Sequence, residues 1–160
     1  MANFLITTAN TLAEGTSTAD TFYFNTARGV SIRGADGADV LTAGTANLTA
    51  TNALLAGNAG NDTINLLSSF NTNQGSILGG AGNDTISASQ FSAVDSLIQG
   101  GGGNDTVTIF TGTLNRGNLG LNAGDDSLIL TASAVANSAV IALGGGADTL
   151  TAFNLSSVGS

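Results

Sequence analysis

The chain has 160 residues with 23 glycines, no Pro, Cys, His or Trp, and a net charge of −8 from eleven acidic against three basic residues. A chain of this length is typical of one domain, so we expect a single domain over residues 1–160. Without Cys or His, a disulfide framework is excluded and a transition-metal site would be unusual, which leaves hard cations on oxygen ligands. The scarcity of Lys and Arg argues against nucleic acid as a partner, and no apolar run is long enough for a transmembrane helix.

The N-terminal segment resembles neither an export signal nor a regular repeat. It begins Met1-Ala-Asn-Phe-Leu-Ile, without a basic region and with only a short apolar stretch, so we predict no Sec-type signal peptide. Gly15-Thr-Ser-Thr-Ala-Asp20 is a weak copy of a motif that recurs later in the chain. We therefore expect residues 1–20 to form a cap and a degenerate first coil, 21–153 regular coils, and 154–160 a C-terminal tail.

Six stronger copies of the same motif follow along the chain. Their final aspartates are separated by 23, 22, 21, 21 and 22 residues. The copies are Gly34-Ala-Asp-Gly-Ala-Asp39, Gly57-Asn-Ala-Gly-Asn-Asp62, Gly79-Gly-Ala-Gly-Asn-Asp84, Gly100-Gly-Gly-Gly-Asn-Asp105, Leu121-Asn-Ala-Gly-Asp-Asp126 and Leu143-Gly-Gly-Gly-Ala-Asp148. A fixed period of this size indicates a repeat architecture in which each unit packs on its neighbours.

Apolar residues recur at fixed distances from each aspartate, as strands alternating between two faces require. Two residues after it come Phe22, Leu41, Ile64, Ile86, Val107, Leu128 and Leu150. Four after it come Phe24, Ala43, Leu66, Ala88, Ile109, Leu130 and Ala152. Directly after it, facing the other way, come Thr21, Thr63, Thr85, Thr106, Ser127 and Thr149. Seven residues before the six full-motif aspartates stand Ile32, Leu55, Ile77, Ile98, Leu119 and Ile141.

These columns define a repeating unit of strand, glycine corner and strand, followed by a looser return of about eight to ten residues. One such unit cannot bury its own apolar face, so the units must stack. We predict an all-β fold, a right-handed parallel β-solenoid (a β-roll or β-helix) of about seven coils of 19–23 residues. A helix is the rival for the alanine-rich segment 131–140, but it would have to restart in every repeat.

The two most regular copies resemble a known calcium-binding repeat. Gly79-Gly-Ala-Gly-Asn-Asp-Thr-Ile-Ser87 and Gly100-Gly-Gly-Gly-Asn-Asp-Thr-Val-Thr108 are similar to the repeats-in-toxin (RTX) nonapeptide. The resemblance implies a parallel β-roll with calcium held between the corners of adjacent coils by aspartate carboxylates and glycine carbonyls. The implied metal-binding residues are Asp39, Asp62, Asp84, Asp105, Asp126 and Asp148, with the backbone of Gly57, Gly60, Gly79, Gly80, Gly82, Gly100, Gly101 and Gly103.

Simple electrostatics also favours a cation at the corners. Aspartates stacked one coil apart would repel by roughly 3 kcal/mol per pair at an effective dielectric of about 20, and a divalent cation would reverse that sign. The chain departs from the RTX pattern by carrying one motif per coil, so at most one calcium row is expected, and by placing Leu121 and Leu143 where the first glycine belongs. A metal-free alternative remains, in which each aspartate accepts hydrogen bonds from nearby backbone amides in an Asx-type turn.

The same residues predict a protein that is not an enzyme. The chain lacks His and Cys and has one glutamate, Glu14; Asp95 and Arg116 are isolated and are interpreted as solvated loop charges. The first hypothesis is a coat, decoration or appendage subunit of a larger extracellular or virion assembly. The second is a secreted RTX-type adhesin or matrix protein that folds on binding calcium outside the cell. The third is an ice-binding protein using the column Thr63, Thr85, Thr106 and Thr149.

We expect the protein to be located outside the cell, at the cell surface or in a virion. Its partners would be other proteins or further copies of itself, with no nucleic acid and no membrane insertion. The returns at 68–74 and 111–118 carry the largest departures from the repeat, so we expect partner contacts there.

Overall fold

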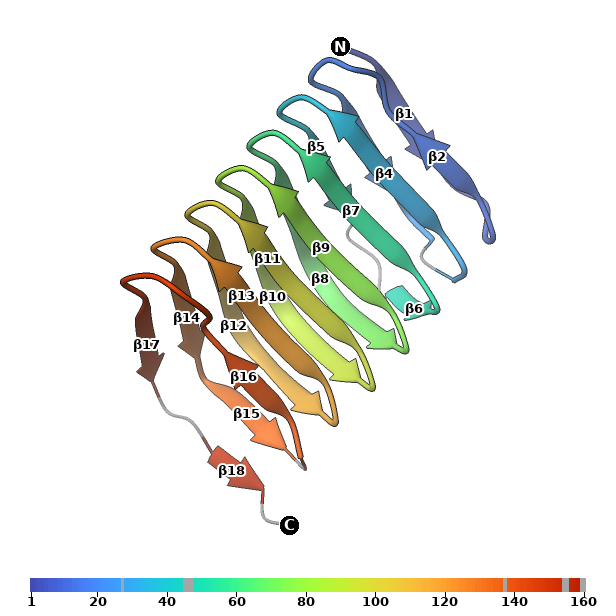
Figure 1. Ribbon diagram of the computed structural model, residues 1–160. Helices are drawn as coiled ribbons and strands as arrows, with labels where there is room; N and C mark the ends of the chain where they lie inside the picture. The colour runs from blue at the N-terminus through green and yellow to red at the C-terminus, as the bar shows by residue number, and fades with distance from the viewer. Residues whose placement is uncertain (27, 45–47, 137, 154–155, 159–160) are drawn as a thin grey trace.

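The computed structural model describes residues 1–26, 28–44, 48–136, 138–153 and 156–158, and it confirms the stacked-coil architecture (Figure 1). The regular secondary structure of the described residues consists of β-strands, and every pair of neighbouring strands is parallel. The coils follow one another in a row from the N-terminus to the C-terminus and make a β-solenoid of about seven turns (Figure 1). Two sheets form its walls. No helix in the described part of the chain is long and apolar enough to cross a membrane.

The strands after the glycine corners build the first sheet. Its main path is β1 (Asn3–Ile6), β3 (Thr21–Phe24), β5 (Val40–Ala43), β8 (Thr63–Asn73), β10 (Thr85–Val94), β12 (Thr106–Asn115), β14 (Ser127–Thr131) and β17 (Thr149–Phe153). Three shorter strands extend it: β6 (Leu48–Thr51) pairs with β8, β15 (Ser133–Ala136) pairs with β12, and β18 (Ser156–Val158) pairs with β15. The expected C-terminal tail therefore contains a strand, and the alanine-rich segment contains β15 instead of a helix.

The strands that enter the glycine corners build the second sheet. In spatial order they are β16 (Val140–Ala142), β13 (Asn118–Ala123), β11 (Leu97–Gly102), β9 (Ser76–Ala81), β7 (Leu54–Ala59), β4 (Ser31–Asp36) and β2 (Leu12–Glu14). Each strand pairs with its counterpart one coil away, so equivalent residues stand in register; Ile98, for example, lies between Ile77 and Leu119. This register gathers the seven aspartates of the corners into one row.

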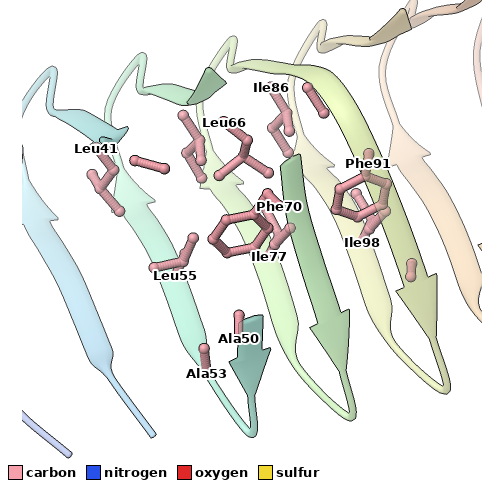
Figure 2. Packing of buried hydrophobic residues seen from close by; sticks show 14 of the residues in the cluster. Leu41, Ala50, Ala53, Leu55, Leu66, Phe70, Ile77, Ile86, Phe91 and Ile98 are labelled. Carbon is pink, nitrogen blue, oxygen red and sulfur yellow. The ribbon is translucent and has the colours of Figure 1, made fainter. Parts of the chain in front are cut away.

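The predicted apolar columns form the core between the two sheets. Leu41, Leu55 and Leu66 are completely buried, and Ile77, Ile86 and Ile98 are at most 3% exposed. Figure 2 shows these side chains lying together between the coils. Among the described residues, these columns become exposed to solvent only in the last coil, where Leu150 is 49% exposed. The alternation in the sequence therefore predicts the core correctly wherever a further coil covers it.

The returns are more regular than the sequence pattern indicates. In the three central coils, strands β8, β10 and β12 run on for 11, 10 and 10 residues and include most of the segment expected to be a loose return. Their later halves bury Phe70, Phe91 and Leu114, each at most 4% exposed. A large apolar side chain is stabilised by burial on this inner face, so the strand continues past a local irregularity after Ala88.

Candidate metal centre

The backbone of each glycine corner turns through two residues with positive φ. In the six-residue motif these are the second and fourth positions, and the fourth is always glycine; the φ angle of Gly60 is 126° and that of Gly82 is 128°. At the second position, Ala35, Asn58 and Asn122 adopt φ angles of 78–82°, a region that residues with a side chain seldom adopt. The second position of the corner thus keeps a positive φ even where its residue is not glycine.

Close approach between coils and φ angles of 118–142° together favour glycine at the fourth position of the six motif copies. A side-chain carbon on Gly60 would lie 1.8 Å from the carbonyl oxygen of Gly37, one coil away. The amide of Gly60 donates a hydrogen bond of 2.8 Å to the carbonyl of Ala81 in the next coil. Glycine is favoured here because the corners stack backbone against backbone at a φ that a residue with a side chain seldom adopts.

The aspartates at the sixth position form a continuous hydrogen-bonded ladder. The amide of Asp39 donates to Oδ1 of Asp62 at 2.7 Å, and the amide of Asp62 donates to Oδ1 of Asp84 at 2.7 Å. The pattern continues through Asp105 and Asp126 to Asp148. These bonds resemble the metal-free alternative, in which each aspartate accepts hydrogen bonds from backbone amides, except that the donor amide belongs to the neighbouring coil. One oxygen of each carboxylate is therefore satisfied by the fold itself.

The second oxygen of these carboxylates has no hydrogen-bond partner. The unpartnered buried atoms are Oδ2 of Asp39, Asp62, Asp84, Asp105 and Asp126, on side chains at most 2% exposed. A buried carboxylate oxygen without a partner is costly, and native structures contain few such atoms. Five of them in one row require a common explanation.

Backbone carbonyls lie beside these unpartnered oxygens. A side-chain carbon on Gly57 would lie 2.2 Å from Oδ2 of Asp62 and 2.6 Å from the carbonyl oxygen of Gly79 in the next coil. The same pair of oxygens, one carboxylate and one carbonyl, adjoins Gly34 and Gly79. A carboxylate oxygen and a carbonyl oxygen facing one space form a donor set suited to a hard cation such as calcium. No three acidic side chains in the described ranges converge on one point, so carbonyls would have to complete any such site.

Burial changes the protonation of the ladder. Burial raises the pKa of Asp62 to about 6 and that of Asp84 to about 7, although the amide hydrogen bond to each carboxylate opposes the change. The pKa values of Asp39 and Asp105 are also raised, again mainly by burial. Neighbouring ladder aspartates add a smaller charge repulsion in each case. The ionised ladder is therefore disfavoured without a compensating positive charge.

The first corner is built differently. Oδ2 of Asp20 accepts hydrogen bonds from the Thr16 amide at 2.6 Å and the Thr16 hydroxyl at 2.8 Å, and Oδ1 accepts one from the amide of Ala2. Burial acts to raise the pKa of Asp20, but these hydrogen bonds outweigh it and hold the pKa below its ordinary value. Both oxygens of this carboxylate are satisfied by the chain.

The two later corners lack the first glycine, as the sequence indicates. Leu121 is completely buried and packs into the core, while Oδ2 of Asp126 still has no partner. Leu143 is partly buried against the same core, and Asp148 is partly exposed. Leucine therefore adds to the core at the motif position that glycine occupies in the corner of Asp62.

A second ladder, which the sequence interpretation missed, runs along the fifth motif position. The amide of Asn83 donates to Oδ1 of Asn61, the amide of Asn104 to Asn83, and the amide of Asp125 to Asn104, at 2.8–2.9 Å. It runs in the opposite sense to the aspartate ladder, because here the later coil supplies the donor. The signal was present as Asn, Asn, Asn and Asp at one position of four successive motifs.

Asp95 and Arg116 are paired, so the interpretation of two isolated charges is wrong. Nε of Arg116 donates to Oδ1 of Asp95 and one terminal guanidinium nitrogen donates to Oδ2, both at 2.7 Å. The pair lies at the corner opposite the glycine motif, one coil apart, and is partly exposed. Hydrogen bonding and charge from Arg116 lower the pKa of Asp95. Their separation of 21 residues, one coil, was the clue in the sequence.

Comparison with protein families matches the same corners. The family model of the RTX calcium-binding nonapeptide repeat (4 copies) matches residues 49–68, 76–90 and 95–108, which contain Asp62, Asp84 and Asp105. No curated protein and no solved structure gives a significant match. The chain therefore contains RTX-type repeats, and these repeats indicate that it binds calcium. The unpartnered carboxylate oxygens and adjoining carbonyls fit this ion.

Proposed function

We propose that this calcium-binding solenoid is a non-catalytic structural protein, a coat, decoration or appendage subunit of a larger extracellular or virion assembly. RTX-type repeats are typically extracellular, which supports the location. Calcium would be held by Asp39, Asp62, Asp84, Asp105, Asp126 and Asp148 together with the corner carbonyls. At the first five of these aspartates it would supply positive charge to a buried carboxylate oxygen that the chain leaves without a partner.

The observation that carries the assembly role is the distribution of exposed apolar side chains. Nine large apolar residues of the described part are exposed, and six of them belong to the first or last coil. These six are Met1, Leu5, Leu12, Val140, Leu150 and Phe153. Strands β2 and β16 are also the edges of the second sheet, and edge strands pair readily with other chains. Apolar edges of this kind support contact between subunits.

One side face offers a further surface for partners. A shallow depression of about 290 Å³ is lined by Asn71, Gln90, Phe91, Ser92, Thr111, Gly112 and Thr113. It coincides with parts of both returns in which we expect partner contacts, 68–74 and 111–118. Its lining carries no charged side chain, which would suit a neutral surface on the neighbouring subunit.

Gel filtration and electron microscopy in millimolar calcium test the assembly role. We expect the wild-type chain to form particles larger than a monomer, and Leu12→Lys to reduce them, because a lysine on an edge strand opposes pairing. Leu67→Lys is the matched control, since Leu67 is similarly exposed (52% against 64%) but lies in a central coil. A wild-type chain that stays monomeric over the accessible concentration range would contradict self-assembly.

The secreted adhesin or matrix protein is the alternative, and the row of unpartnered carboxylates favours it because folding would then depend on calcium. Circular dichroism separates the two roles. A monomer that is unfolded in chelator and folds in millimolar calcium supports the alternative. Melting that is unchanged by chelator at equal ionic strength would contradict calcium in both. Ice binding stays a prediction, with its threonine column on the outer face of the first sheet.

A further inference from the structure

The first corner occupies the same place in the stack as the calcium corners but has a different sequence. Its second and fourth positions are Thr16 and Thr18, where the strong copies have residues with positive φ. Neither threonine adopts a positive φ. The backbone of this corner therefore follows another path, and the Thr16 amide and hydroxyl turn toward Asp20.

The first corner nevertheless contains the same two oxygens as the others. A side-chain carbon on Gly15 would lie 2.9 Å from Oδ2 of Asp20 and 1.9 Å from the carbonyl oxygen of Gly34. Asp20 is 1% exposed and joins the aspartate ladder, because its amide donates to Oδ1 of Asp39 at 2.6 Å. Burial, ladder position and adjoining carbonyl are thus shared with the corner of Asp62. The two corners differ in their backbone path and in the hydrogen bonding of Oδ2.

From this difference we infer that Thr16 takes the place of the ion in the first corner, so that the calcium row begins at Asp39 and Asp20 is not a calcium ligand. Two donors on one residue satisfy the oxygen that a cation would otherwise neutralise. The first coil is then a metal-independent cap at one end of the row. The inference rests on the proposed calcium role of the other corners.

The other oxygen of Asp20 is also satisfied. Oδ1 of Asp20 accepts a hydrogen bond from the amide of Ala2. This amide takes the place that the amide of the preceding ladder aspartate has in the other corners. Every polar group of this carboxylate is satisfied within one coil and its flanking segment.

Paired substitutions in the full-length chain test the inference. Asp20→Asn and Asp62→Asn are isosteric and keep an oxygen acceptor for the ladder. Native mass spectrometry in calcium counts the bound ions, and thermal unfolding is followed in calcium and in chelator at equal ionic strength. We expect Asp62→Asn to lose at least one ion and to reduce the calcium-induced rise in melting temperature. Asp20→Asn should keep the wild-type ion count and lower the melting temperature equally in both conditions.

Thr16→Gly provides the reciprocal test, with Thr16→Ala as a milder variant; both remove the hydroxyl donor, and glycine also permits the positive φ of the other corners, which would turn the amide of residue 16 away from Asp20. Loss of the hydroxyl donor should make the first corner respond to calcium, so the melting temperature should fall further in chelator than in calcium. Loss of an ion in Asp20→Asn, or a fall that is independent of calcium in both Thr16 variants, would overturn the assignment alone. A wild-type chain that binds no calcium would overturn the proposed function and this inference together.

Discussion

The corners of Asp20 and Asp84 place the same side chain in the same ladder with opposite consequences. Both aspartates are at most 2% exposed, and both accept a backbone amide through Oδ1. Thr16 satisfies the second oxygen of Asp20, whereas that of Asp84 has no partner. The pKa of Asp20 is accordingly lowered and that of Asp84 is raised to about 7. A buried carboxylate can therefore be completed by the chain or left for a cation, depending on whether the second motif position supplies donors to its second oxygen.

The largest expected effect on the free energy of unfolding comes from substitutions at the fourth motif position, where the first corner and the glycine corners differ in backbone conformation. Gly60→Ala should lower the free energy of unfolding by at least about 2 kcal/mol, because the residue would keep a strained positive φ and its new carbon would meet the Gly37 carbonyl oxygen. Thr18→Ala is the matched change at the same motif position in the first corner. It should cost about 1 kcal/mol or less, since Thr18 has an ordinary φ. Chemical denaturation in calcium measures both; equal losses would contradict the different backbone paths.

The pH dependence of stability should differ with and without calcium. A carboxyl whose pKa is raised in the folded state stabilises the fold below its unfolded pKa, and that contribution is lost as pH rises through the folded pKa. Asp62 and Asp84, with folded pKa values of about 6 and about 7, should therefore lower the melting temperature in chelator between about pH 4 and pH 7. Calcium favours the ionised form, so the calcium-induced rise should grow over the same interval.

Asp84→Asn is the control for this profile. The amide is neutral at every pH, so the fall in chelator should become shallower and the melting temperature near pH 8 should rise by a few degrees. In calcium the same substitution should be destabilising. Differential scanning calorimetry at several pH values detects the reversal, and a profile that is identical for the variant and the wild-type chain would exclude Asp84 as its origin. Asp20 has the opposite sign, because its lowered pKa stabilises the fold above its unfolded pKa and that contribution is lost as pH falls.

The asparagine ladder gives a smaller effect that should not depend on calcium. Asn83→Ala removes the acceptor for the amide of Asn104, at 2.8 Å, and should cost about 0.5–1 kcal/mol because the site is exposed to water. The first two corners have alanine at this position, Ala19 and Ala38. Ala38→Asn should extend the ladder by one coil and stabilise the protein by a similar amount. Urea denaturation in chelator and in calcium checks both signs; a calcium-dependent change would place this ladder in the metal site.

The sequence predicts the structural features that follow from the repeat period and from the alternation of apolar and polar residues. It predicts poorly the features that depend on contacts between coils. The apolar columns and the glycine corners follow from local spacing, so the core and its register could be predicted. The strands in the returns were missed because Phe91 lies out of phase with the alternation of Ile86 and Ala88, and the stacking of whole coils stabilises the strand past that point. The replacement of an ion by Thr16 depends on the direction of one amide and one hydroxyl, which no spacing reveals.

Disrupting the pair of Asp95 and Arg116 should have the smallest effect on stability. The pair also serves as a reference contact between coils that involves no metal. It joins neighbouring coils as the aspartate ladder does, but at the opposite corner, partly exposed and with both charges supplied by the chain. A double-mutant cycle with Asp95→Asn and Arg116→Gln should give a coupling energy of about 0.2–1 kcal/mol, since solvent and salt screen exposed pairs. That coupling should fall with added sodium chloride and should be the same in calcium and in chelator. A coupling energy that changes with calcium would mean that calcium binding at the aspartate ladder also affects the opposite corner. It would contradict the view that the pair of Asp95 and Arg116 is independent of the metal.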